Sequence, residues 1–92
     1  MTVRFTRRAI DDIARIFTYL DERSPAGAFS VKRALKRTIE TIETFPMGGR
    51  VSGWKELRER PVSPYPYVVY WAVEGEDVLI IHIRHAARRP PE

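Results

Sequence analysis

The chain has 92 residues, with 16 Lys or Arg against 12 Asp or Glu, which gives a net charge of +4 at pH 7. Its length predicts one domain with a single hydrophobic core, and 43% hydrophobic with 30% charged residues excludes a disordered chain. Without cysteine, and with two histidines, the chain can form neither a disulfide nor an ordinary zinc site, so we expect no metal and no cofactor.

The first twelve residues, MTVRFTRRAIDD, are charged and lack the long apolar stretch of a signal peptide. The longest apolar run, VLII at 78–81, is too short to cross a bilayer. We therefore expect a cytoplasmic protein without a membrane partner. Its excess of Lys and Arg suits an acidic binding partner.

A short strand over 3–5 is predicted to precede a helical hairpin over about 7–44. Thr6 is a suitable cap for the first helix, and Ser24 followed by Pro25 is a start signal for the second. Both helices carry apolar residues every three or four positions. In the first these are Ala9, Ile10, Ile13, Phe17 and Leu20, and in the second Ala28, Val31, Leu35, Ile39, Ile42 and Phe45.

Beyond Gly53 the apolar period changes to two, which predicts antiparallel strands over 54–62, 67–73 and 78–85. In the last strand we expect one face to pack on the helices, namely Leu79, Ile81, Ile83 and His85. The prolines near the end predict a loose tail over 86–92. The predicted fold is α+β: a single domain over 1–92, with an N-terminal helical hairpin packed on a small antiparallel sheet.

Five segments in this order resemble the RelE/ParE superfamily of type II toxins, which are known in bacteria as plasmid-stabilisation proteins. They are FTRRAIDDIARIFTYLDERSPAGA, ETFPMGGR, LRER, YPYVVYWAV and IHIRHAARRP. The resemblance implies the toxin of a toxin–antitoxin pair, neutralised by a small antitoxin whose C-terminal segment folds onto it.

The superfamily contains two kinds of toxin on one fold. RelE-like members cleave mRNA at the ribosome, and ParE-like members are described as inhibiting DNA gyrase by binding. The nucleases carry an arginine on the middle strand and a tyrosine near the C-terminus, together with other cations. Here Arg58 and Arg88 match two of those cations, but Tyr67 stands at the middle-strand arginine position and no tyrosine follows Trp71.

This pattern, with YPY at 65–67 and the HAAR ending, resembles the ParE-like branch and implies a gyrase-binding toxin that is not an enzyme. The alternative is a RelE-like ribosome-dependent endoribonuclease that uses Arg58, His85 and Arg88. The predicted target-binding residues are Arg58, His85, Arg88 and Arg89. The predicted antitoxin-binding residues are Lys32, Arg33, Lys36 and Arg37, on the polar face of the second helix.

Each assignment has a structural alternative. Arg58 could be a structural residue, either in an ion pair with the nearby Glu56 or Glu59 or on a face of the sheet. His85 could be a buried hydrogen-bonded side chain, and the basic face of the second helix could simply be solvated. The adjacent carboxylates Asp11 and Asp12 point about 100° apart on a helix, so we interpret them as residues that interact with the helix dipole.

Overall fold

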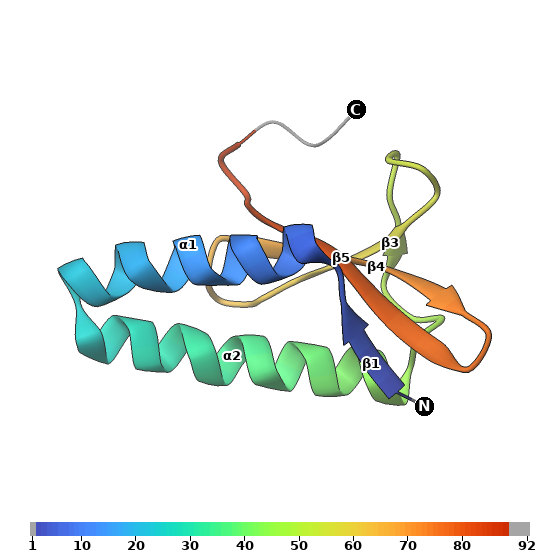
Figure 1. Ribbon diagram of the computed structural model, residues 1–92, viewed down its shortest axis with the longest axis horizontal. Helices are drawn as coiled ribbons and strands as arrows, with labels where there is room; N and C mark the ends of the chain where they lie inside the picture. The colour runs from blue at the N-terminus through green and yellow to red at the C-terminus, as the bar shows by residue number, and fades with distance from the viewer. Residues whose placement is uncertain (1, 89–92) are drawn as a thin grey trace.

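The computed structural model describes residues 2–88. Two helices lie side by side and antiparallel (Figure 1), and they pack on a five-stranded sheet with the strand order β1-β5-β4-β3-β2. The predicted α+β class and the helical hairpin are therefore confirmed. The elements are β1 (Thr2–Phe5), α1 (Arg7–Arg23), α2 (Pro25–Thr44), β2 (Arg50–Val51), β3 (Arg58–Pro61), β4 (Tyr67–Glu74) and β5 (Asp77–His85).

The two helices begin where the sequence predicts. The Thr6 hydroxyl oxygen accepts a hydrogen bond from the Ala9 amide (3.1 Å), and Ser24 does the same for the Gly27 amide (3.0 Å). Ser24 is the single residue between the helices, so the chain must reverse there and the helices must lie antiparallel. Within residues 2–88, no helix is both long and apolar enough to span a bilayer.

The sheet is mixed, which corrects the antiparallel prediction. β2 to β5 form antiparallel pairs, but β1 runs parallel to β5 along its whole length, from Thr2 opposite Asp77 to Phe5 opposite Ile80. The rest of the chain forms one long connection between these two neighbours, and such a connection permits a parallel pair.

The predicted strand over 54–62 is shorter and preceded by a turn. β3 begins at Arg58, and it also pairs with the two-residue β2, which the sequence did not indicate. Before it, Lys55 and Glu56 both have positive φ (51° and 59°), and the Leu57 amide closes the turn by donating to the Trp54 carbonyl at 2.9 Å. This conformation cannot continue a strand, so the regular alternation stops there.

An irregularity in β5 changes which residues reach the core. Tyr70 pairs with His82 but Trp71 pairs with Ile80, so Ile81 is an extra residue in the ladder. Val78 and Ile80 face the helices before this bulge and Ile83 faces them after it. The predicted core face was therefore wrong for Leu79 and Ile81 and right for Ile83.

The Phe-Pro-Met-Gly-Gly segment after α2 packs on Trp71. This tryptophan is fully buried, and its Nε1 donates to the Pro46 carbonyl (2.9 Å). Gly49 lies against the same ring with a φ of +72°, and a Cβ there would approach Trp71 Cη2 to 2.6 Å and the Glu59 carbonyl to 2.7 Å. The segment is thus a packing motif that needs glycine for both space and backbone conformation.

Three glycine substitutions test this packing. We expect Gly49→Ala to lower the free energy of unfolding by about 3 kcal/mol, because it adds overpacking to a left-handed backbone. Gly75→Ala keeps only the backbone strain, since Gly75 has a φ of +59° and open space around it, and should cost about 1 kcal/mol. Gly53→Ala, which has neither feature, should be near neutral. Equal urea midpoints for all three variants would contradict this account.

Candidate functional site

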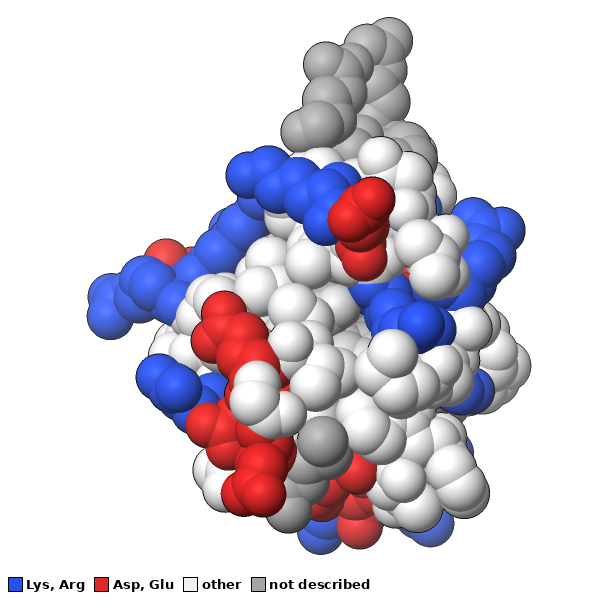
Figure 2. All heavy atoms as spheres, turned by 90° about the vertical axis from the view of Figure 1, so that its right-hand side faces the viewer, with Lys and Arg blue, Asp and Glu red and all other residues white. Residues whose placement is uncertain are grey.

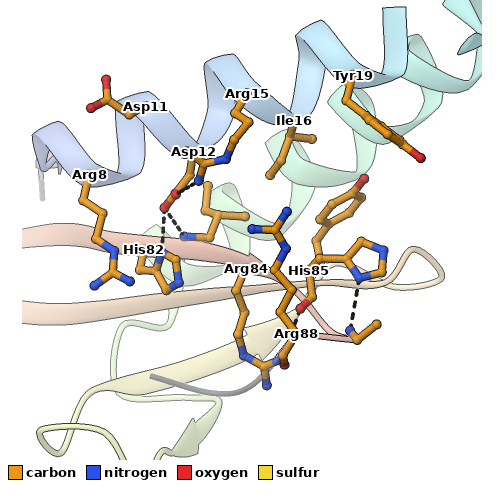
Figure 3. A pocket seen from close by; sticks show the side chains of 13 residues that line it. Arg8, Asp11, Asp12, Arg15, Ile16, Tyr19, His82, Arg84, His85 and Arg88 are labelled. Carbon is orange, nitrogen blue, oxygen red and sulfur yellow. Dashed lines mark hydrogen bonds and ion pairs between the residues drawn. The ribbon is translucent and has the colours of Figure 1, made fainter. Parts of the chain in front are cut away.

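A groove of about 940 Å³ lies between α1 and the C-terminal end of β5, and we call it the α1–β5 groove (Figure 3). Arginines predominate among its charged residues: Arg8 and Arg15 from α1, and Arg84 and Arg88 from β5 and the turn after it. By contrast, the face at the right of Figure 1 carries charges of both signs around an uncharged centre (Figure 2). The α1–β5 groove is therefore the candidate functional site.

Asp12 holds the two sides of this groove together. Its carboxylate is 2% exposed, and one oxygen accepts from the Ile83 amide (3.0 Å) and lies 2.6 Å from His82 Nδ1. The other oxygen accepts from Arg15 Nη2 at 2.6 Å. The helix-dipole interpretation of Asp12 was thus wrong, whereas Asp11 lies on the surface, 3.3 Å from Arg7.

The position of Asp12 follows from the end of β1. The Thr6 amide donates to the Ile80 carbonyl (3.0 Å) and the Thr6 hydroxyl to the Ile81 carbonyl (2.8 Å), where β1 stops pairing with β5. The next amide along this edge, that of Ile83, would otherwise be buried without a partner. The Asp12 carboxylate accepts the hydrogen bond of this amide, so a side chain of α1 takes the place of a neighbouring strand at this edge of β5.

His82 is the buried partner of Asp12. Its ring stacks on Tyr70 with centroids 5.8 Å apart and meets the edge of Trp54 at 5.7 Å. Burial lowers the pKa of His82, and the guanidinium groups of Arg8 and Arg15 act in the same direction, while the hydrogen bond to Asp12 opposes them. At neutral pH the imidazole is therefore uncharged and donates its Nδ1 proton to Asp12.

Arg84 fixes the turn that follows β5. Its Nε donates to the Tyr70 hydroxyl (2.7 Å), and its Nη1 donates to the carbonyls of His85, Ala86 and Arg88 at 3.1–3.3 Å. The predicted loose tail was therefore wrong for residues 86–88, which form a hydrogen-bonded turn. The remainder of that tail, including Arg89, lies outside the described residues.

His85 belongs to the same turn. Its Nδ1 accepts from the Ala87 amide (3.1 Å), so the neutral imidazole carries its proton on Nε2. Its ring also meets the Tyr67 ring edge to face at 5.4 Å. His85 is half-buried and lines the α1–β5 groove with Arg88. The structure thus brings together two of the predicted target-binding residues.

Arg58 lies elsewhere and has a structural role. Its Nη1 donates to the Met47 carbonyl (2.7 Å) and to the Gly48 carbonyl (3.3 Å), so it holds the loop that packs on Trp71. In the part of the chain that the structure describes, Arg58 forms no ion pair with Glu56 or Glu59, and Glu59 pairs with Arg50 at 2.8 Å. A role of Arg58 in target binding stays a prediction. Within residues 2–88, no three His, Asp or Glu side chains gather in a way that could hold a metal ion.

The sequence interpretation did not assign Arg8, Arg15 and Arg84 to this site. Helical spacing places Arg8 and Arg15 on the same side of α1 as Asp12, and that signal could have identified them. Nothing in the sequence marked Arg84, because its partners are carbonyl groups of a turn that only the fold reveals.

A second, mostly apolar groove of about 750 Å³ separates α1 from α2 on the other side of α1, and we call it the α1–α2 groove. Lys32 and Lys36 line it, and Phe29 beside them is 62% exposed. Of the predicted antitoxin-binding residues, Arg33 and Arg37 are exposed on α2 outside the groove. The apolar residues that line the α1–α2 groove are Phe5, Ile13, Phe17, Pro25, Ala28, Phe29, Leu35 and Ile39.

Comparisons with known proteins agree with one another. The model of the ParE toxin family, described as the ParE toxin of the type II toxin–antitoxin system parDE, matches residues 3–90. Toxin RelE2 of Caulobacter vibrioides is 37% identical over 94% of this chain and 96% of its own length. Putative toxin Y4kP of Sinorhizobium fredii is 26% identical over 98% of this chain and 93% of its own.

A solved structure has the same fold. A chain from the chromosomal ParDE TA system of P. aeruginosa matches with a TM-score of 0.81 at 20% identity. The match covers 92% of this chain and 95% of that one, so it includes the helical hairpin and the sheet.

The contribution of Asp12 can be measured with a matched pair of variants. We expect Asp12→Asn to lower the free energy of unfolding by about 3 kcal/mol, because it removes a buried carboxylate that accepts hydrogen bonds from Arg15, His82 and the Ile83 amide. Asp11→Asn changes an exposed carboxylate beside it and should shift stability by less than about 0.5 kcal/mol. Urea unfolding measures both, and equal small effects would show that the Asp12 contacts contribute little.

The lowered pKa of His82 predicts a pH dependence of stability. Since the unfolded histidine titrates near 6.5 and the folded one resists protonation, the free energy of unfolding should be highest above about pH 6.5 and fall as the solution is acidified. His82→Gln should flatten this fall, whereas His85→Gln should retain it. An unchanged pH profile in His82→Gln would exclude His82 as its source.

Proposed function

The chain belongs to the ParE toxin family and is the toxin of a type II toxin–antitoxin system, and we propose that it inhibits its target by binding to it without cleaving RNA. We propose that this target is DNA gyrase. The family implies a cognate antitoxin as the neutralising partner. The proposal concerns the target and the manner of action, since the two branches of the superfamily differ in both.

Tyr67 is the observation that carries this proposal. It stands on β4 at the position where the nuclease branch has an arginine, and it is only 8% exposed, with its ring against His85. A phenol carries no positive charge at any pH, so Tyr67 cannot replace an arginine beside a phosphate. Burial raises the pKa of the Tyr67 phenol, which keeps it uncharged at physiological pH. Lacking this cation, the site has lost a group that would stabilise the cleavage transition state.

Of two further groups expected in a nuclease site, the C-terminal tyrosine is missing and the first-strand arginine, Arg58, is hydrogen-bonded to backbone carbonyls. No tyrosine follows Trp71, so the phenol that would protonate a leaving group is absent from the sequence. Removing one general acid or base typically costs about 10²–10⁴ in rate. Arg58 donates to the Met47 and Gly48 carbonyls and supports a loop. These features favour binding over cleavage.

His85 and Arg88 remain as residues for contact with the target, since both line the α1–β5 groove. Arg89 follows directly in the chain, and its role in target binding stays a prediction. Arg58 could contribute only indirectly, by supporting the loop after α2.

The antitoxin is proposed to dock on the opposite side of α1. The α1–α2 groove has an apolar lining and an exposed Phe29, which suits the apolar face of an amphipathic helix. Lys32 and Lys36 at this groove would meet acidic residues of that helix. Arg33 and Arg37 lie farther round α2, where they would act only through long-range attraction.

The alternative function is ribosome-dependent cleavage of mRNA. It is favoured by the name of the relative at 37% identity, Toxin RelE2, and by the gathering of arginines beside His85. On this alternative His85 and Arg88 would act on the RNA while the ribosome supplied the missing groups. Purified toxin incubated with programmed ribosomes would then produce cleaved mRNA, and His85→Ala would abolish the cleavage.

Gyrase supercoiling of relaxed plasmid tests the proposal. We expect purified toxin to inhibit supercoiling, Arg88→Ala to weaken this inhibition about tenfold, and programmed ribosomes to yield intact mRNA. Since Arg88 is exposed, the substitution should leave the fold unchanged, which circular dichroism would verify. A folded toxin that arrests growth, leaves supercoiling unaffected and cleaves mRNA on ribosomes would contradict the gyrase proposal and support the alternative function.

Adding the cognate antitoxin to the same assay tests where on the toxin the antitoxin binds. Cognate antitoxin should relieve the inhibition, and Lys32→Glu with Lys36→Glu should weaken that relief while the variant toxin stays active. Arg33→Glu with Arg37→Glu makes the same charge change outside the α1–α2 groove and should have a smaller effect. Equal effects of the two pairs would contradict docking in this groove.

A further inference from the structure

Two arginines at the α1–β5 groove are held by contacts that leave their charge unneutralised. The Arg8 guanidinium lies 5.2 Å from the centre of the Trp54 ring. The backbone of Arg88 is fixed, since its carbonyl accepts from Arg84 Nη1 (3.1 Å) and its amide donates to the His85 carbonyl (3.0 Å). Among residues 2–88, no carboxylate forms an ion pair with Arg8 or Arg88.

The carboxylates of this groove have partners already. Asp12 is buried and shared between His82 and Arg15, and Asp11 pairs with Arg7 at 3.3 Å. Arg15 uses Nη2 for Asp12, while its side chain is 58% exposed. The groove therefore presents a net positive charge, and a ligand that binds it must supply anions.

The two unneutralised arginines come from opposite sides of the groove. In Figure 3, Arg8 reaches from α1 toward β5, and Arg88 reaches back from the turn toward α1. Ile16 and Tyr19 extend the α1 side with apolar surface. Two guanidinium groups on opposite sides of a groove favour an extended ligand with several negative groups. The Arg8 side chain, already held on Trp54, also loses less conformational entropy on binding than a free surface arginine would.

We propose that the α1–β5 groove binds a carboxylate-rich peptide segment of the protein that the toxin inhibits, with Arg8 and Arg88 as its main contacts. This inference rests on the proposed function, because it names the kind of segment that the target-binding residues recognise. It adds Arg8, on α1, to the predicted target-binding residues, which were Arg58 and three residues near the C-terminal end.

The aromatic rings of the groove distinguish a peptide from single-stranded nucleic acid. Nucleic-acid sites of that kind stack bases on exposed rings. Here Tyr67 is 8% exposed, and Tyr19, which is 52% exposed, has the Arg23 guanidinium 3.6 Å from its ring centre and so over one face of the ring. Two bases in succession therefore have no pair of open rings to stack on at Tyr19 and Tyr67, and the arginines are the main groups left for recognition. Arginine forms paired hydrogen bonds with carboxylates as it does with phosphates, so charge alone suffices to bind an acidic peptide.

Fluorescence anisotropy with defined probes tests the inference. The probes are a labelled peptide of alternating Glu and Gly, the same peptide with Gln for Glu, and oligouridylate of equal charge. We expect the Glu peptide to bind in low salt, the Gln peptide not to bind, and oligouridylate to bind more weakly than the Glu peptide. Arg8→Gln with Arg88→Gln should raise the Kd of the Glu peptide about tenfold.

A second pair of variants controls for charge. Arg33→Gln with Arg37→Gln removes the same charge from exposed positions on α2 and should change the Kd less than twofold. Equal weakening by both pairs would mean diffuse attraction and would overturn the proposal. Tighter binding of oligouridylate, lost in Arg8→Gln with Arg88→Gln, would overturn it in favour of nucleic acid.

Gyrase supercoiling with the same variants separates this inference from the proposed function. If wild-type toxin binds the Glu peptide through Arg8 and Arg88 but never inhibits gyrase, the choice of gyrase fails and the peptide site stands. If gyrase is inhibited equally by wild type and by Arg8→Gln with Arg88→Gln, the groove does not serve the target and the inference fails.

Discussion

The buried carboxylate of Asp12 is the contact on which the candidate site depends. β1 stops pairing with β5 at Ile80, and the side chains of Thr6 and Asp12 then form hydrogen bonds with backbone groups of β5 that no strand pairs with. The helix is thereby attached to the strand at His82 and Ile83. Because this attachment comes from one side chain rather than from a further strand, a groove is left beyond it, and the arginines gather there.

The fold could be predicted from local signals, and the site only in part. Capping by Thr6 and Ser24 and the spacing of apolar residues define both helices, since these effects act between neighbours in the chain. The burial of Asp12 depends on partners about 70 residues away, and the extra residue at Ile81 depends on how β5 pairs with Tyr70 and Trp71 of β4. Periodicity carries no information about either. His85 and Arg88 were found through a family resemblance, whereas Arg84 acts on a turn that no pattern indicates.

The Phe-Pro-Met-Gly-Gly segment and Arg58 both belong to motifs that carry the family resemblance, and in the structure both contribute to packing. They form one packed unit with the fully buried Trp71. Tyr67 is likewise largely buried, where a nuclease of this superfamily would present a cation. Once these residues are assigned to packing, the charged groups at the α1–β5 groove are what remains for recognition. The resulting picture is of a toxin with a separate groove on each side of α1, one mostly apolar and one cationic.

Hydrogen–deuterium exchange of the toxin with and without gyrase would test this account most directly, because it asks both whether gyrase binds and where. The account predicts slower exchange in the turn over 86–88 and in the first turns of α1, with little change in the exposed face of α2. Slower exchange confined to α2, or no change at saturating gyrase, would contradict the claim that this toxin binds gyrase through the α1–β5 groove.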